Sequence, residues 1–316
     1  MQKVGRYDLP TFFYGHMADS TVSRNVRRIP NGLRWLLVAT AGLVAVAGVS
    51  WAAGSWIAQP QRHSVGPVPD GWNAQSVEIG SQEGLVRGWY ADGKPGRGAV
   101  LLLHGVRADR RAMVPRARAL HERGYAVLLI DLYAHGESDG DMIGFGPKEA
   151  AGIRSALDWM RDRLPSERLG VIGASLGGAG LLLAHQGRPP DAVVLEAVFT
   201  SIETAVDNRV RERVGPLAAA LSPLLLGQMP MRLGVAPDQV RPVDHMAQLA
   251  APVLVAGGAE DRYTTQAETE HMFAVAAEPK QLWVVPGAGH VDLYRFAPQA
   301  YEAQVFGFLS RYLQKQ

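Results

Sequence analysis

A glycine-flanked serine in mid-chain constrains the fold more than any other feature of the sequence. The apolar run 169–172 leads into Gly173-Ala174-Ser175-Leu176-Gly177, and an apolar, helix-like run follows. A serine on so sharp a strand-to-helix turn has strained backbone angles, and only very small side chains fit two residues to either side. The pattern predicts a nucleophile elbow. The alternative is a glycine-rich turn that only packs or binds phosphate, and the spacing G-x-G-x-x-G of dinucleotide sites is absent from this run.

Short apolar runs recur through the last three quarters of the chain and are predicted to be strands. A hairpin signal separates the first two, and segments of helical periodicity separate the later ones. The predicted strands are 76–79, 85–90, 99–103, 126–130, 169–172, 192–195, 253–256 and 282–285, and the predicted helices are 113–123, 147–163, 176–186, 265–276 and 298–313. This order predicts an α/β fold with a mostly parallel sheet covered by helices. Between about 200 and 250, helix-like pieces broken by prolines predict a small helical cap.

A serine hydroxyl needs a base, and in this class of sheet the chain order is serine, acid, histidine. Asp261 and His290 follow predicted strands in that order, each a few residues past the strand end. Carboxyl ends of parallel strands share one edge, so Ser175 as nucleophile, Asp261 as orienting acid and His290 as general base are expected to meet there. Two alternatives stay open: His290 is a surface-loop histidine, or Asp261 only caps a helix while Glu260 or Glu196 is the acid.

Acyl transfer also needs hydrogen-bond donors where charge develops on the carbonyl oxygen. The backbone N–H of Leu176, and that of Val106 in the loop after strand 99–103, are the predicted oxyanion donors. His104 and Gly105 form either part of that loop or merely a tight turn, and His104 is expected to order it. Ser138 stands in a second match to the bare pattern, Gly136 to Gly140, but loop residues follow it, so it is predicted to be a loop residue.

The segment 35–58 carries no charged residue and is long enough at helical rise to cross a hydrocarbon core, which predicts a transmembrane helix. Four arginines precede the segment and one closely follows it: Arg24, Arg27, Arg28 and Arg34 before, and Arg62 after. This bias in positive charge predicts a single-pass protein with a cytoplasmic N-terminus and an extracytoplasmic catalytic domain. A signal peptide cleaved near Ala45-Val46-Ala47 and a buried core helix are the alternatives, and the long polar lead-in disfavours the former. The expected organisation is a cytoplasmic segment 1–34, the helix 35–58, a proline-containing linker 59–75 and a hydrolase-like domain 76–316.

Composition excludes several classes of protein. A net charge of +2, with scattered arginines, disfavours a nucleic-acid partner. Because the chain has no cysteine, disulfides, thiolate metal sites and a cysteine nucleophile are excluded. His121, His135 and His185 lack metal-ligand spacing with acidic residues and are expected to be structural or exposed. No metal or cofactor is implied.

From about residue 75 to the C-terminus the chain resembles serine hydrolases of the α/β-hydrolase superfamily. The matching pieces are 103–105, 131–138, 173–178, 257–261 and 287–290, and Arg241-Pro242-Val243-Asp244 resembles the small-capped branch that contains membrane-associated thioesterases and serine peptidase-like hydrolases. Dehalogenases of the superfamily use aspartate where Ser175 stands. The resemblance implies hydrolysis of an ester or thioester through an acyl-enzyme on Ser175.

Two other functions are alternatives to this prediction. A serine peptidase shares the same acyl chemistry, and a catalytically silent module can keep the fold while its cap binds a partner. The apolar stretch 216–226 of the expected cap would line an acyl pocket, contact the bilayer or simply pack within the cap.

Overall fold

The computed structural model describes residues 30–184 and 187–315. The chain has two compact units, Met1–Ala45 and Val46–Gln316, and the sheet, the cap and the predicted site all lie in the second. Most of the expected cytoplasmic segment 1–34, with Arg24, Arg27 and Arg28, lies outside the described residues, and so does His185.

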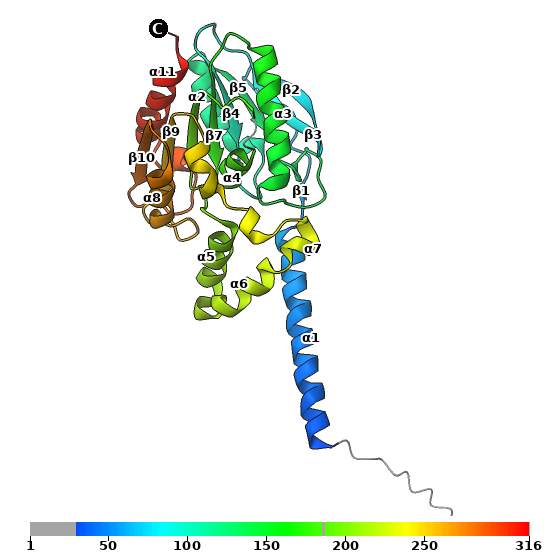
Figure 1. Cartoon of the computed structure of the whole chain (residues 1–316). Coiled ribbons are helices and arrows are strands. Elements are labelled where there is room, and N and C mark those ends of the chain that lie inside the picture. Colours follow the sequence, from blue (N-terminus) through cyan, green and yellow to red (C-terminus); the bar gives the residue numbers. More distant parts are fainter. Residues whose placement is uncertain (1–29, 185–186, 316) are drawn as a thin grey trace, which may run out of the picture. The chain divides into compact units, whose positions relative to one another are not determined.

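An eight-stranded sheet forms the centre of the second unit and confirms the predicted α/β-hydrolase fold (Figure 1). Its order is β10-β9-β8-β7-β4-β5-β3-β2, parallel except where β3 pairs with β2 and with β5. β4, β5 and β8 are buried along their whole length, which is why their sequences are continuously apolar. The strands are β2 (Gln75–Ser81), β3 (Gly84–Ala91), β4 (Ala99–Leu103), β5 (Ala126–Ile130), β7 (Leu169–Ala174), β8 (Ala192–Glu196), β9 (Val253–Gly258) and β10 (Lys280–Val285).

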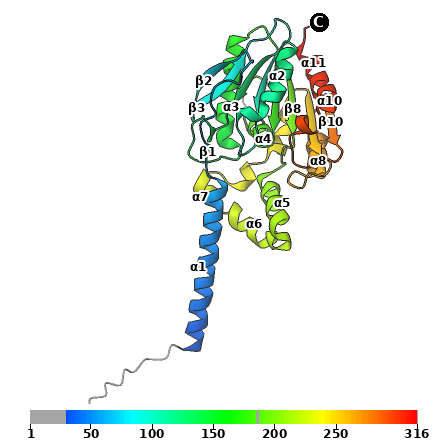
Figure 2. The ribbon, with the colours of Figure 1, turned by 180° about the vertical axis from the view of Figure 1, so that it is seen from behind.

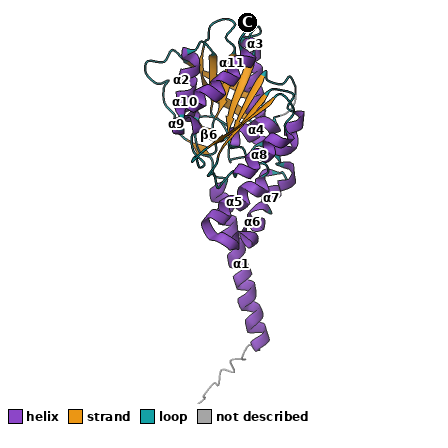
Figure 3. Cartoon of the chain, turned by 90° about the vertical axis from the view of Figure 1, so that its left-hand side faces the viewer, coloured by secondary structure: helices purple, strands orange, loops and turns teal. Residues whose placement is uncertain are grey.

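Helices cover both faces of this sheet (Figure 3). α3, α4 and α8 contribute Ile153, Leu182 and Met272 to the apolar cluster on one face, whereas α2 and α11 contribute Leu120 and Leu309 to the cluster on the other. The helix expected over 298–313 is interrupted by a π-helical turn. The bounds are η1 (Arg110–Met113), α2 (Val114–Glu122), α3 (Pro147–Arg163), α4 (Leu176–Leu183), α8 (Gln266–Val275), α9 (Leu293–Phe296), α10 (Pro298–Tyr301), the π turn (Glu302–Phe306) and α11 (Gly307–Leu313).

A helical cap fills the stretch between β8 and β9 and projects from the sheet edge at which β8 ends (Figure 1). Ser201 begins it by accepting a hydrogen bond from the Thr204 backbone N–H at 3.2 Å. Gly215, with a φ of 59°, ends the first cap helix and lets the chain turn back. The elements are α5 (Ile202–Val214), η2 (Gly215–Leu217), α6 (Ala218–Leu226), α7 (Met229–Leu233), η3 (Pro237–Gln239) and η4 (Pro242–Gln248).

The apolar N-terminal run forms one helix, α1 (Asn31–Ile57), of 27 residues. Its most apolar window has a mean hydropathy of 2.0, and none of its residues is buried; Leu43 is 72% exposed. The interpretation of this run as a buried core helix is therefore wrong. A helix of this length and composition is long and apolar enough to cross a membrane, and signal sequences near an N-terminus share these features.

Residues 59–75, expected to be a linker, are bonded to the rest of the second unit. β1 (Gln61–Arg62) pairs in parallel with β6 (His135–Gly136). Beyond it, the Val65 N–H donates to Glu137 Oε1 at 3.0 Å. The Trp72 indole N–H donates to His121 Nδ1 of α2 at 3.2 Å, and the Trp72 ring is buried. The segment is therefore part of the folded domain.

Candidate active site

Ser175 occupies a strained turn between β7 and α4. Its φ and ψ are 47° and −111°, a region that L-residues rarely adopt. The Ser175 N–H donates to the carbonyl of Glu196 on neighbouring β8 at 2.8 Å, which fixes the turn against the sheet. A Cβ at Gly173 would lie 2.6 Å from Gly178 Cα, and one at Gly177 would lie 2.6 Å from Leu103 Cβ. Only glycine fits at 173 and 177, as the sequence pattern predicts for a nucleophile elbow.

Asp261 and His290 form a direct pair. His290 Nδ1 lies 2.7 Å from Asp261 Oδ2, and the buried carboxylate also accepts the backbone N–H groups of Tyr263 at 2.8 Å and Thr264 at 2.9 Å through Oδ1. Because an ionised carboxylate only accepts, Nδ1 carries the proton and Nε2 is left as a base. Of the two alternative acids, Glu260 is exposed, and the carboxylate of Glu196 is bonded to Arg116.

The three predicted residues follow strands β7, β9 and β10, which end at the same edge of the sheet. The loops that carry Asp261 and His290 are joined by a hydrogen bond from the Glu260 N–H to the Ala288 carbonyl, at 2.9 Å. Between the described side chains of Ser175 and His290 there is no hydrogen bond. Hydrogen bonds between catalytic side chains are often long before substrate is bound and tighten in the complex.

The loop after β4 lies against Ser175, since a Cβ on Gly105 would be 3.6 Å from Ser175 Cβ. Two buried histidines hold this loop. His104 Nδ1 bonds the Gly105 carbonyl at 2.7 Å and its Nε2 accepts the Leu132 N–H at 3.0 Å. His135 Nε2 accepts the Arg107 N–H at 3.1 Å. His104 thus orders the loop that carries Val106.

These two histidines make folding sensitive to acid. Burial lowers the pKa of His104 and of His135 to about 4, from about 6.5. The unfolded chain therefore binds more protons between pH 6.5 and pH 4, and the free energy of unfolding falls as the pH drops through that window, by up to roughly 3 kcal/mol for each histidine. Denaturant unfolding in detergent at pH 7 and pH 4.5 measures this loss.

The contribution of His135 is isolated by substitution. His135→Gln removes one titrating group and is expected to flatten the dependence of the unfolding free energy on pH. Equal slopes in His135→Gln and wild type would contradict the assignment.

A buried ion cluster lies beside the site, and no sequence pattern predicted it. The Arg116 guanidinium bonds Glu196 Oε2 at 2.7 Å, Asp292 Oδ1 at 2.8 Å and the Tyr301 hydroxyl at 3.0 Å. Glu196 is the residue whose carbonyl holds the Ser175 N–H, and Asp292 caps α9 two residues beyond His290. The cluster therefore ties the elbow to the histidine loop.

The second glycine-flanked serine is a structural residue, as the sequence predicts. The Ser138 hydroxyl is buried, donates to the Asp131 carbonyl at 2.7 Å and accepts the Arg87 N–H at 2.8 Å. Because the Ser138 hydroxyl already donates to one backbone group and accepts from another, it is not available to a substrate.

The site loop also contacts the last turn of α1. Arg107, whose φ is 61°, stacks its guanidinium over the Trp56 ring at 4.2 Å from the ring centroid. The same group donates to the Trp56 carbonyl at 2.9 Å. The residue next to Val106 is thus bonded directly to the end of the apolar helix.

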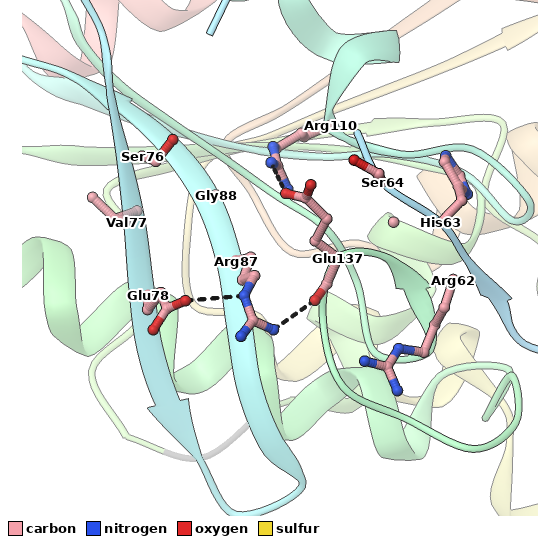
Figure 4. A pocket seen from close by; sticks show the side chains of 11 residues that line it. Arg62, His63, Ser64, Ser76, Val77, Glu78, Arg87, Gly88, Arg110 and Glu137 are labelled. Atoms are coloured by element: carbon pink, nitrogen blue, oxygen red, sulfur yellow. Dashed lines mark hydrogen bonds and ion pairs between the residues drawn. The ribbon is translucent and has the colours of Figure 1, made fainter. Parts of the chain in front are cut away.

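A wide hollow lies elsewhere, between β1, β3 and the Glu137 loop (Figure 4). It is charged, but its charges pair with one another: Arg87 bonds Glu78 at 3.0 Å, and Arg110 bonds Glu137. Ser175, Asp261 and His290 are not part of its lining. Among the described residues no group of three or more histidines and acids could hold a metal ion.

Comparisons with known proteins agree with this arrangement. A family model described as serine aminopeptidase, S33, matches residues 94–241. The uncharacterized protein Rv2307c of Mycobacterium tuberculosis is 33% identical over 241 residues, 72% of this chain and 78% of that protein. The uncharacterized protein YfhR of Escherichia coli K12 is 26% identical over 241 residues, 72% of this chain and 76% of that protein. The esterase Pf2001 of Pyrococcus furiosus superposes with a TM-score of 0.68 at 22% identity, covering 81% of this chain and 98% of that structure.

The parallel sheet, the serine turn and the acid–histidine pair have the same chain order as the hydrolases of this fold. Taken with the family match and the relative in Mycobacterium tuberculosis, they lead to one conclusion: the chain is a hydrolase and belongs to the α/β-hydrolase superfamily.

Proposed function

We propose that this hydrolase cleaves a carboxylic ester or an acyl thioester through an acyl-enzyme on Ser175. His290 Nε2 takes the hydroxyl proton as Ser175 Oγ attacks the carbonyl carbon, and that proton leaves with the alcohol or thiol. Water, deprotonated by His290, then releases the acid. The observation that carries the proposal is the 2.7 Å bond between His290 Nδ1 and the buried Asp261 carboxylate.

The negative charge that develops on the carbonyl oxygen is stabilised by two backbone N–H groups, those of Leu176 and Val106. Support for Leu176 is its place as the first residue of α4, where N–H groups have no partner within the helix. Support for Val106 is the approach of its neighbour Gly105 to Ser175 and the rigid hold of His104 and His135 on this loop. No metal or cofactor takes part in these steps.

A serine peptidase of the same fold is the second candidate, and the description of the matching family as a serine aminopeptidase favours it. Amide cleavage by the same residues differs in one requirement: His290 must protonate the leaving amine. A non-catalytic binding module is the third candidate.

α1 crosses the membrane once in this proposal, with a cytoplasmic N-terminus and the hydrolase domain outside. Its support is the length of 27 residues, the mean hydropathy of 2.0 and the lack of buried residues, together with the arginines that precede it. Cleavage as a signal peptide near Ala47 is the alternative. A membrane-held domain suits a small-molecule acyl substrate that resides in or near lipid.

Labelling with a fluorophosphonate probe tests the activated serine. Because the probe traps only serines whose hydroxyl is activated, we expect the full-length protein in isolated membranes to be labelled, and peptide mass spectrometry to find the adduct on Ser175. Failure of the folded protein to react would favour the binding module. An adduct on another serine would move the nucleophile.

Turnover of matched substrates in the same experiment separates the enzyme classes. With one acyl group presented as a nitrophenyl ester, a thioester and a peptide anilide, faster hydrolysis of the first two supports the proposed function, and faster hydrolysis of the anilide supports the peptidase.

A further inference from the structure

We infer that the outer surface of the cap is a lipid-contact surface that lies in the membrane interface. We call the exposed large apolar side chains of the cap, Val214, Leu217, Leu224 and Met231, the cap face. The inference rests on the proposed membrane span of α1 and adds a second, independent contact between the hydrolase domain and the bilayer.

The cap face is unusually apolar for a surface. Leu217 is 65% exposed, Met231 is 79% exposed and Leu224 is 42% exposed, all within one short stretch of chain. Outside α1 and the cap, the other described large apolar residues at comparable exposure are Leu85, Val291 and Phe296. Within Ile202–Leu233, the most apolar stretch of 18 residues has a mean hydropathy of 1.2, yet only 22% of that stretch is buried. Clustered exposed apolar side chains on a soluble surface mark a contact with a partner or a membrane.

α7 of the cap lies beside the last turns of α1 (Figures 1 and 2), and hydrogen bonds join the two. Gln228 Nε2 donates to the Ser50 carbonyl at 3.0 Å and to Ser50 Oγ at 2.9 Å. Arg232 donates to the Trp51 carbonyl at 2.6 Å and stacks over the Trp51 ring at 3.7 Å. All of these residues belong to the unit Val46–Gln316, so the last turns of α1 and the cap form one packed structure.

The depth of this contact follows from helix geometry. At ~1.5 Å per residue, the stretch from residue 35 to residue 55 spans ~30 Å, the thickness of a hydrocarbon core. The turn at 50–55 that holds α7 therefore stands at the outer boundary of the core. Tryptophan prefers this interface, and both Trp51 and Trp56 stand there. Because Gln228 and Arg232, at either end of α7, are bonded to this turn, the proposed span places α7 and Met231 at the membrane interface.

Lipid is favoured over other occupants for two reasons. The cap is bonded to the last turns of α1 through Gln228 and Arg232, so a span of α1 in lipid brings the cap to the membrane surface without any further binding partner. The cap is not itself a second span, because α5 carries the charged residues Arg209, Arg211, Glu212 and Arg213 and the chain turns at Gly215. Its apolar side chains therefore lie in the interface plane, as in helices that rest on a membrane without crossing it.

Position-specific quenching tests the inference, and the absence of cysteine from the chain makes single labels straightforward. Leu217→Cys and Met231→Cys report on the cap face. Val44→Cys reports on α1, and Lys94→Cys is an exposed control in the loop that precedes β4, at the sheet edge opposite the cap. Each full-length variant carries an environment-sensitive fluorophore in phosphatidylcholine nanodiscs, with a nitroxide on the lipid acyl chains or iodide in the water as quencher.

We expect the lipid nitroxide to quench at least half of the fluorescence at 217, 231 and 44, and iodide to quench only position 94. Nitroxide quenching at 44 without any at 217 and 231 would overturn the cap inference and leave the span intact. Protection of 217 and 231 from both quenchers would also overturn it, since a protein partner or a second copy would then cover the face. Absence of nitroxide quenching at 44 would refute the membrane span itself.

Discussion

Ser175→Ala is expected to lower ester turnover by roughly 10³- to 10⁶-fold while the protein still folds. The substitution removes one oxygen atom from a buried turn, and alanine fits wherever serine does, so the elbow and its hydrogen bond to the Glu196 carbonyl remain. The measurement is kcat/KM on a nitrophenyl ester, with circular dichroism and the thermal midpoint as checks on folding. Residual activity would come from the oxyanion donors and substrate binding alone.

Ser138→Ala is the matched control because Ser138 stands between glycines in the same bare pattern. Loss of its bonds to the Asp131 carbonyl and the Arg87 N–H is expected to cost about 1–3 kcal/mol of stability without changing turnover per folded molecule. Retained hydrolysis in Ser175→Ala, or its loss in a folded Ser138→Ala protein, would transfer the nucleophile and remove the basis of the proposed mechanism.

Asp261→Asn is expected to reduce kcat by about 10⁴-fold, the scale set by loss of the orienting carboxylate in enzymes with a Ser-His-Asp triad. The amide can present an N–H to His290 Nδ1, which then keeps its proton at Nε2 and cannot accept one from Ser175. Oδ1 is retained as an acceptor for the Tyr263 and Thr264 N–H groups, so the loop keeps its shape. Pre-steady-state acylation by a nitrophenyl ester measures the slowed step.

Glu260→Gln provides the comparison for that experiment. Glu260 neighbours Asp261, is exposed, and contributes to the site through its backbone bond to the Ala288 carbonyl, which the substitution leaves in place. Its turnover should match wild type. A large loss in Glu260→Gln together with a small one in Asp261→Asn would reassign the acid.

Much of the fold was predictable because the sheet is covered on both faces. β4 and β5 are buried end to end, so their sequences are apolar runs short enough to be strands. The tight turn at Ser175 was predictable for a mechanical reason, since no side chain fits at Gly173 or Gly177. Asp261 and His290 were predictable from strand ends and chain order, and their meeting at one sheet edge followed from the parallel strands; the bond between Nδ1 and Oδ2 at 2.7 Å is a detail that only the folded loops supply.

What the sequence could not predict are contacts between distant polar residues. Arg116 is one of many arginines, and its carboxylate partner Glu196 is 80 residues away. Nothing in a helical arginine distinguishes a buried ion cluster from an ordinary solvated side chain. The docking of the linker was missed for a related reason: β1 and β6 have two residues each, too few for any periodic signal.

The pairing of β1 with β6 has a consequence for which substrates can be reached. As a free coil, the segment 59–75 would let the domain range over roughly 20–25 Å from its attachment point. Gln61 and Arg62 are instead paired with β6, Trp72 is buried and Arg107 is bonded to Trp56. These contacts remove that freedom of movement. The hydrolase domain cannot then search the surrounding solution on a tether. With α1 in the proposed membrane span, the site would be held at a set height above the lipid, and the local concentration of substrate at the membrane surface, rather than in bulk water, would govern the rate.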